Sequence, residues 1–215
     1  MISMQAKHLN IVQACILIMY TKYICENNGG DIINKKETIK RKKCIIDIET
    51  TGFDPWTGRI VCIGVMDIDS KKIEVFYDNH EESFLVQFLY YFQKMEFREI
   101  IGFNIGFDIR WIIGRALFYN IPSANAFYMA KSTDLMHLLK GSRRFFNFNK
   151  AGTLDQWSRF LLGKGKLLKS GSIPALYREG KIDEILAYNK NDVEITFELW
   201  LRITTVLGGV NHGAK

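Results

Sequence analysis

Two acidic residues lie inside an apolar run, and this feature most limits how the chain can fold. The run Cys44–Glu49 reads Cys-Ile-Ile-Asp-Ile-Glu, which is typical of a buried β-strand. Strand side chains alternate between two faces, so Asp47 and Glu49 share a face, about 6.6 Å apart. Two such carboxylates repel each other and resist desolvation, and a hard divalent cation is their natural partner. The alternative is a half-exposed edge strand whose acids face water, and this pair alone leaves both readings open.

The segments that follow predict an α/β fold. Strands at Arg59–Asp67 and Ile73–Tyr77 form an antiparallel meander with the first strand. The remaining expected elements are a helix at Glu82–Lys94, a short strand at Glu99–Phe103, a helix to about Tyr119, a strand at Ala126–Ala130, a helix capped by Ser132, Thr133 or Asp134, and a long helix at Ile182–Leu207. Three antiparallel strands followed by parallel strands make a mixed sheet with helices on its faces.

Length and charge set the expected organisation. The 215 residues fit one ordinary domain, predicted at residues 43–207, with an N-terminal extension (helix plus basic linker) at 1–42 and a flexible tail at 208–215. The net charge of +6 and the isoelectric point near 9.1 are compatible with a polyanionic partner but do not prove one.

Cysteine spacing and hydropathy give expectations about the compartment. The four cysteines form neither a C-x-x-C pair nor a zinc-like pattern, and Cys44 and Cys62 lie in apolar, strand-like runs. We therefore expect buried free thiols and a reducing, cytoplasmic location. The apolar stretch Ile11–Tyr20 is too short for a membrane span, which needs roughly 20 residues, so we expect a helix docked on the domain and no membrane partner.

Two further pairs of polar residues have helical spacing. Asn104 and Asp108 are four residues apart at the expected start of a helix, where Asn104 could equally be a simple cap. Tyr188 and Asp192 are also four apart, on the apolar face of the last helix. An acid on such a face requires a partner, which could be a neighbouring lysine such as Lys190.

Together these segments resemble the motifs of the DEDD exonuclease superfamily, the proofreading nucleases of the ribonuclease H-like fold. The segments that carry the resemblance are Asp47-Ile48-Glu49-Thr50-Thr51-Gly52, Ile101-Gly102-Phe103-Asn104-Ile105-Gly106-Phe107-Asp108 and Tyr188-Asn189-Lys190-Asn191-Asp192. Ala187 stands where the histidine branch has its histidine, which favours the tyrosine branch. The stretch from Ser172 to Gly180 also resembles exonuclease domains related to family B DNA polymerases.

The resemblance covers about residues 43 to 205 and implies a ribonuclease H-like fold, an activity and a site. It implies a 3′–5′ exonuclease in which Asp47, Glu49, Asp108 and Asp192 hold two Mg²⁺ or Mn²⁺ ions. Tyr188 would then position the attacking water. The implied contacts to the terminal nucleotide come from Thr50, Thr51, Phe53, Asn104 and Phe107.

A basic stretch precedes the last helix and suggests a path for a nucleic-acid strand. Between Leu138 and Lys169 it contains one acid, Asp155, and eight basic residues that include Arg143 and Arg144. We expect these charges to contact phosphates, as in single-strand binders that combine cationic tracks with aromatic rings. The phenylalanines at 145, 146 and 148 could stack on bases or pack inward.

The expected substrate is single-stranded nucleic acid, with DNA favoured over RNA. One alternative is a ribonuclease that trims RNA 3′ ends, because no residue in the sequence decides 2′-hydroxyl discrimination. Another is a catalytically weak binding subunit of the same fold. Any role in replication or repair would require a partner protein, because the chain has no room for a polymerase or helicase.

Overall fold

The computed structural model describes residues 42–140, 152–167 and 173–207, and the predictions for the N-terminal extension and the C-terminal tail lie outside this part. Within it, one sheet has the strand order β3-β2-β1-β4-β5. The strands are β1 (Lys43–Thr50), β2 (Ile60–Asp67), β3 (Ile73–Phe76), β4 (Glu99–Gly102) and β5 (Lys131–Asp134). β1, β2 and β3 pair antiparallel, whereas β1, β4 and β5 pair parallel. The predicted mixed sheet with flanking helices is therefore confirmed.

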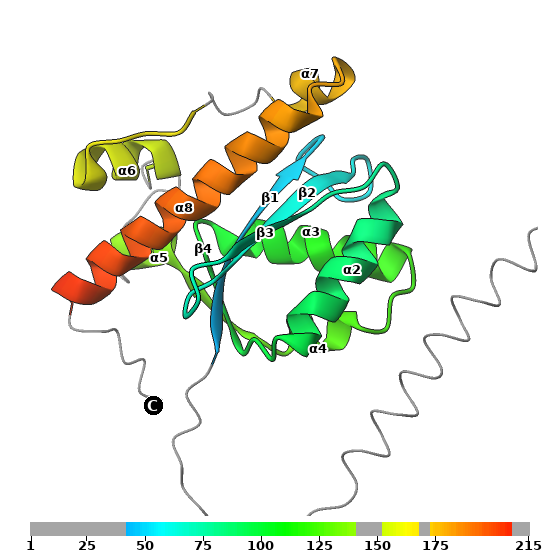
Figure 1. The fold of residues 1–215 in the computed structure, drawn as a ribbon, viewed down its shortest axis with the longest axis horizontal. Helices are drawn as coiled ribbons and strands as arrows, with labels where there is room; N and C mark the ends of the chain where they lie inside the picture. Colours follow the sequence, from blue (N-terminus) through cyan, green and yellow to red (C-terminus); the bar gives the residue numbers. More distant parts are fainter. Residues whose placement is uncertain (1–41, 141–151, 168–172, 208–215) are drawn as a thin grey trace, which may run out of the picture. The chain divides into compact units, whose positions relative to one another are not determined.

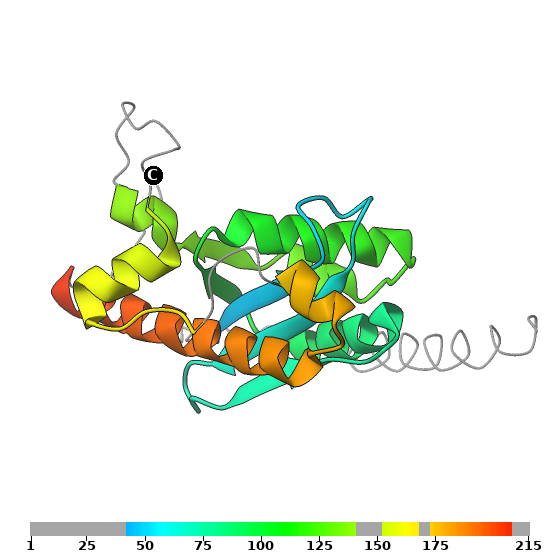
Figure 2. The ribbon, with the colours of Figure 1, turned by 90° about the horizontal axis from the view of Figure 1, so that it is seen from above.

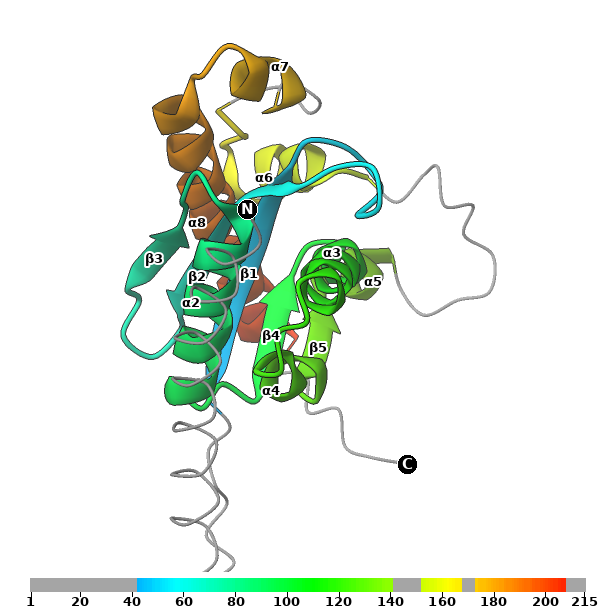
Figure 3. The same cartoon turned by 90° about the vertical axis from the view of Figure 1, so that its right-hand side faces the viewer.

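Helices cover both faces of this sheet. They are α2 (Glu81–Lys94), α3 (Ile105–Phe118), α4 (Ala124–Tyr128), α5 (Leu135–Lys140), α6 (Leu154–Leu162), α7 (Ile173–Arg178) and α8 (Ile182–Val206). The long helix α8 crosses one face, against β1 and β2 (Figure 1). Figure 3 looks onto the other face, which α2, α3 and α4 cover. Figure 2 shows the sheet between α8 and α3. Among the described helices, none is long and apolar enough to cross a membrane.

The strand alternation of β1 divides the core into two layers. Ile46 and Ile48 pack with the phenylalanines of α2 and with Trp111 of α3. Ile45, on the opposite face, packs with Val193 and other residues of α8. Asp47 and Glu49 continue the face of Ile45, so both acids lie on the side of the sheet that α8 covers. Burial of the flanking isoleucines thus fixes the orientation of the two carboxylates.

The last strand lies later in the chain than its predicted position at Ala126–Ala130. Residues Ala124–Tyr128 form α4, and β5 begins at Lys131. Phe127 of this helix is buried, and its ring packs edge-on against Phe88 of α2, with 5.6 Å between centroids. β5 is the polar sequence Lys-Ser-Thr-Asp, which carries no apolar alternation for a pattern to detect.

One predicted helix cap and two predicted buried thiols lie in the described part of the chain. The predicted capping by Asp134 is confirmed, since its Oδ1 accepts a hydrogen bond from the Met136 backbone N–H at 2.9 Å. Cys44 and Cys62 are buried free thiols, as predicted. The two other cysteines lie outside the described residues.

Candidate active site

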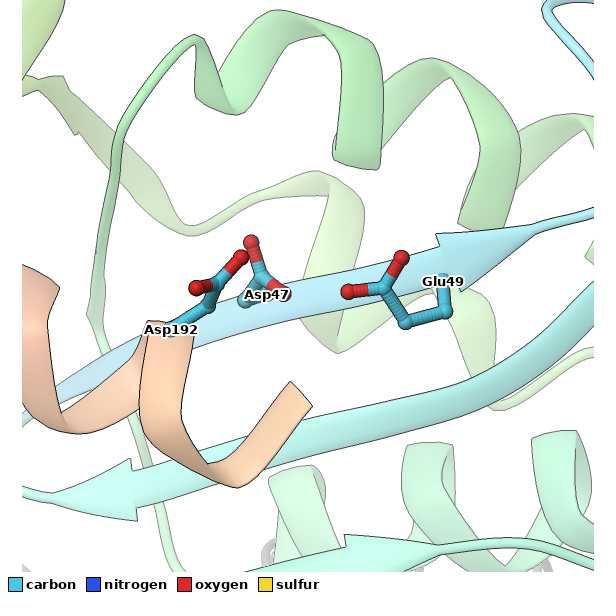
Figure 4. A group of neighbouring side chains, drawn as sticks. All are labelled: Asp47, Glu49 and Asp192. Carbon is cyan, nitrogen blue, oxygen red and sulfur yellow. The ribbon is translucent and has the colours of Figure 1, made fainter. Parts of the chain in front are cut away.

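Three carboxylates meet above the second half of β1. One oxygen from each of Asp47, Glu49 and Asp192 lies within 4.8 Å of the others. Figure 4 shows Asp47 and Glu49 pointing from the same side of β1, with Asp192 of α8 beside Asp47. Residues 47 and 192 are far apart in sequence, so this cluster exists only when α8 packs on the sheet.

A glycine on β2 lets α8 approach the acids closely. Gly64 pairs with Asp47 in the register of β1 and β2. A Cβ at Gly64 would lie 2.2 Å from the Asn189 side-chain oxygen and 2.9 Å from Val193, both on α8. In the space that remains, the Asn189 amide donates hydrogen bonds to the Asp47 backbone oxygen at 3.0 Å and to its Oδ2 at 2.9 Å. Asn189 therefore fixes both the helix and the carboxylate.

The fourth predicted acid reaches the site from α3. β4 pairs with residues 43–45 of β1, and none of the described strands lies beside the other half of β1 on that side. The start of α3 lies there, and Asp108 Oδ1 accepts a hydrogen bond from the Ile48 backbone N–H at 3.1 Å. Asp108 is buried and close enough to Asp47 for the Asp47 charge to raise its pKa, but it lies outside the cluster of three carboxylates.

Tyr188 lies one helical turn before Asp192 and is 3% exposed. It packs in a cluster with Val61 and Cys62 of β2 and Leu176 of α7. Burial and the nearby Asp192 charge raise the pKa of Tyr188 above its ordinary value. Its hydroxyl therefore stays protonated near neutral pH and can donate a hydrogen bond.

Lys166, one of the eight basic residues in the stretch expected to contact phosphates, lies at the acids instead. The Lys166 ammonium forms an ion pair with Asp192 Oδ2 and lies 4.9 Å from the centroid of the Tyr188 ring. Burial lowers the pKa of Lys166, but the charges of Asp192 and Asp47 outweigh this and raise it. Sequence reasoning missed this role, since no spacing rule links Lys166 to Asp192.

Two other described cations of that stretch are paired with acids. Arg159 forms an ion pair with Asp155 at 2.9 Å, and Lys164 forms one with Glu198 at 2.6 Å. The proposed phosphate contacts Arg143 and Arg144, together with the three phenylalanines, lie outside the described residues.

The predicted nucleotide contacts have varied surroundings. Phe53 is 83% exposed, whereas Phe107 is half-buried beside Trp111. Asn104 is exposed in the left-handed region at φ 63° and gives no side-chain cap to α3, which contradicts its reading as a simple cap. Thr50 Oγ1 donates to the Gly52 carbonyl at 2.7 Å, and Thr51 Oγ1 accepts from the Arg59 backbone N–H at 3.0 Å. Both threonines therefore shape the loop after β1.

The crowded acids resist ionisation. Desolvation, followed by repulsion from Asp192, raises the pKa of Asp47 to about 7. Desolvation raises the pKa of Glu49 and Asp108 as well, and the charge of Asp47 adds to both shifts. The pKa of Asp192 is also raised by desolvation, which the positive charge of Lys166 opposes. The described cations thus leave the site short of positive charge.

The donor set fits hard divalent cations. The clustered donors are carboxylate oxygens, which Mg²⁺ and Mn²⁺ prefer. Apart from the contact with Lys166, the buried Asp192 oxygens receive no hydrogen bond of standard geometry from the described residues. Lys166 contacts Oδ2, so Oδ1 is left buried without a donor among the described residues, which is costly unless a second cation lies beside it.

The fold, and with it the acidic site, belongs to a known superfamily. Residues 44–204 match the family model RNase_H_2 of the RNase_H superfamily, and the chain belongs to that superfamily. Membership suggests nuclease activity on nucleic acid, and the acidic cluster could bind a metal.

Among individual proteins, the chain is similar to "Uncharacterized protein MJ0365" of Methanocaldococcus jannaschii. The two are 35% identical over 167 residues, which cover 74% of this chain and 93% of the relative. The similarity therefore spans nearly the whole of that relative.

Proposed function

We propose that the protein is a metal-dependent 3′–5′ exonuclease of the tyrosine branch of the DEDD superfamily. Its substrate is the 3′ end of single-stranded nucleic acid, with DNA favoured over RNA. The observation that carries this proposal is the convergence of one oxygen each from Asp47, Glu49 and Asp192 within 4.8 Å. Asp108 is hydrogen-bonded to the backbone of β1, the strand that carries Asp47 and Glu49. The catalytic domain in this proposal is residues 43–207, and residues 1–42 are an extension.

In this proposal Asp47, Glu49, Asp108 and Asp192 hold two Mg²⁺ or Mn²⁺ ions. Bound divalent cations supply Lewis acidity, which lowers the pKa of a water and offsets negative charge on the phosphate. Hydrogen bonds within the chain fix the positions of two of these carboxylates. Asn189 holds the Asp47 carboxylate, and the Ile48 backbone N–H holds that of Asp108.

Tyr188 orients the attacking water in this scheme. Its raised pKa keeps the phenol protonated, so it acts as a hydrogen-bond donor and not as a base. Packing against Val61 and Cys62 restricts its ring, and a fixed donor contributes more to orientation than a mobile one.

The activity is tested with a 5′-labelled single-stranded oligonucleotide in Mg²⁺, in Mn²⁺ and in EDTA. The labelled strand should shorten one nucleotide at a time from its 3′ end as mononucleotides are released, and this shortening should require the metal. Asp192→Asn should slow release about a hundredfold or more, since a metal-binding carboxylate contributes several kcal/mol. The matched control is Asp183→Asn, which removes an exposed acid from the same helix and should leave the rate unchanged.

Two further comparisons define the substrate. A 3′-blocked oligonucleotide should resist digestion, and matched DNA and RNA strands should differ in rate, with DNA faster. The exonuclease assignment is lost if Asp192→Asn matches the wild type at equal concentration, or if internal fragments form first. A faster RNA reaction would instead assign the same chemistry to RNA 3′ ends.

A further inference from the structure

A basic pocket adjoins the acidic site. It lies between the loop after β1, the start of β2 and helix α7, and its volume is about 550 Å³. That is within the range of roughly 300–1,000 Å³ typical of small-molecule sites. Thr51, Arg59, Tyr177 and Arg178 are among its lining residues, and none of the described residues that line it is acidic. The lining therefore suits an anion with an attached ring.

The pocket shares structural elements with the acids. Thr51 follows Glu49 by two residues, just after the end of β1. On the opposite wall, Leu176 precedes the pocket residue Tyr177 and packs in the same cluster as Tyr188. A strand whose phosphate lies at the acids can thus place a neighbouring nucleotide in this pocket.

The two arginines have unused hydrogen-bond donors. Arg59 Nη2 donates to the Asn79 carbonyl at 3.1 Å, but its buried Nε has no partner among the described residues. Arg178 is exposed, and its Nε donates to the Pro174 carbonyl at 3.2 Å. Neither arginine forms a salt bridge with a carboxylate in the part of the chain that the structure describes. Unpaired guanidinium groups are well suited to phosphate.

Tyr177 adds an aromatic wall. The Arg59 guanidinium carbon lies 5.5 Å from the centroid of its ring, so cation and ring form one surface. Sites for single-stranded nucleic acid combine positive charge that follows the backbone with rings on which bases stack. The pocket has both features beside a site proposed to cut phosphodiester bonds.

The geometry points to a nucleotide subsite in this pocket: Arg59 and Arg178 bind a backbone phosphate of the substrate strand, and Tyr177 stacks on the base. The bound nucleotide neighbours the one whose phosphate lies at the acids. This inference rests on the proposed function for the identity of the strand. Single-stranded nucleic acid is the ligand class, and the subsite would contribute to affinity and positioning.

Binding without hydrolysis tests the subsite. Fluorescently labelled oligothymidylates of increasing length are titrated in EDTA and followed by anisotropy. Arg178→Gln and Tyr177→Leu should each weaken binding about tenfold, which is the loss expected for one phosphate or one stacked base. Arg178→Gln should also lower the salt dependence by about 0.7 in log–log slope, as for one phosphate contact to a single strand. Tyr177→Leu should leave that slope unchanged.

The control is Arg98→Gln, which removes an exposed positive charge at the opposite end of β4 from the site. It should bind like the wild type. The inference is overturned if Arg178→Gln binds like the wild type, or if Arg98→Gln weakens binding equally. Arg59→Gln is a second variant, interpreted only when its melting temperature matches that of the wild type. If Arg59→Gln lowers the melting temperature, the Arg178 and Tyr177 variants still decide the test.

Hydrolysis separates failure of the subsite from failure of the proposed function. If the wild type degrades oligonucleotides and the pocket variants match it in KM and affinity, the subsite fails and the exonuclease stands. If the wild type has no activity but the variants weaken binding, the exonuclease fails and a nucleotide-binding pocket remains. When both hold, the pocket variants raise KM and leave kcat within about twofold.

Discussion

The Lys166 ammonium contacts the Asp192 carboxylate in a nearly dry environment, where the two side chains are 15% and 1% exposed. The lysine reaches this position because its backbone N–H donates to Asp155 Oδ1 at 2.8 Å, which anchors the segment after α6. The chain therefore brings one internal cation to a site that contains several buried acids. This pair helps the acidic cluster to fold before any metal is bound.

Lys166→Met should destabilise the metal-free protein. Removing one partner leaves Asp192 buried without its counter-charge, so the free energy of unfolding in EDTA should fall by about 3 kcal/mol. Saturating Mg²⁺ should reduce that loss, because a divalent cation replaces the missing charge. Denaturant titrations in EDTA and in Mg²⁺ measure both effects.

Lys164→Met is the matched control for this change. It removes another lysine ammonium, two residues earlier, whose ion pair with Glu198 is about half-exposed. This pair should contribute under about 1 kcal/mol to the free energy of unfolding. An equal loss in both variants, or a Lys166→Met loss that Mg²⁺ leaves unchanged, would contradict the role given to Lys166.

Stability and metal binding should both depend on pH through Asp47. Its pKa is raised from 3.8 to about 7 by desolvation and by Asp192. Between these values the folded state holds a proton that the unfolded state has released, so stability in EDTA should fall as pH rises through this window. A divalent cation competes with the same proton. The rise in melting temperature caused by Mg²⁺ should therefore increase from about pH 6 to about pH 8.

Thermal melts at several pH values, with EDTA and with Mg²⁺, check this prediction. Asp47→Asn lacks the titrating group and should show a flatter pH dependence and a smaller metal effect. The linkage to Asp47 would be contradicted if the rise in melting temperature caused by Mg²⁺ stayed constant or decreased from about pH 6 to about pH 8.

Gly64→Ala should move α8 away from the acids. The added methyl would meet the Asn189 side chain at 2.2 Å, a distance that neither group can accept without a shift. We expect a loss of about 1–3 kcal/mol in the free energy of unfolding, as for other overpacked cores. Stabilisation by Mg²⁺ should weaken too, because Asn189 no longer holds Asp47.

Gly106→Ala is the corresponding control in α3, since a Cβ there meets nothing within 4 Å. A helical glycine replaced by alanine should be neutral or gain up to about 1 kcal/mol. If Gly64→Ala is as stable as Gly106→Ala and binds Mg²⁺ like the wild type, the position of α8 against the acids does not depend on Gly64.

Arg115→Met should be among the most destabilising single changes in the described domain. The Arg115 guanidinium makes two hydrogen bonds to Glu81, at 2.6 and 2.9 Å, and donates to the Pro55 carbonyl at 3.1 Å. Breaking a buried pair of this kind costs about 3–5 kcal/mol. Arg110→Met removes a half-exposed arginine of the same helix, whose ion pair with Asp54 spans 3.6 Å, and should cost under about 1 kcal/mol. Chemical denaturation compares the two, and similar losses would refute the argument.

Much of the fold could be predicted from local patterns. The alternation of Ile45 to Glu49 located β1 and oriented its acids, and helical periodicity placed α8 to within one residue of its observed end. β5 escaped detection because it is polar and is held by pairing with β4. Such a strand depends on its neighbours, which a local pattern does not contain.

Residue spacing alone predicted the site only as pairs, and the resemblance to the DEDD exonucleases was needed to group the four acids. Strand and helix spacing grouped Asp47 with Glu49 and Tyr188 with Asp192, but the contact between the groups depends on how α8 packs. Lys166 illustrates the limit, because a flexible side chain in a charged stretch gives no sign of which carboxylate it will meet. Long-range contacts of this kind follow from tertiary packing and not from sequence periodicity.

The late position of α8 in the chain affects when the site can form. β1 and α3 are synthesised early, whereas Asp192 lies on the last described helix. A nascent chain still missing α8, or a fragment truncated before it, has Asp47 and Glu49 without the third carboxylate of the cluster. Under the proposed function, hydrolysis would begin only once α8 had docked on the sheet, and a chain without α8 would leave nucleic acid intact.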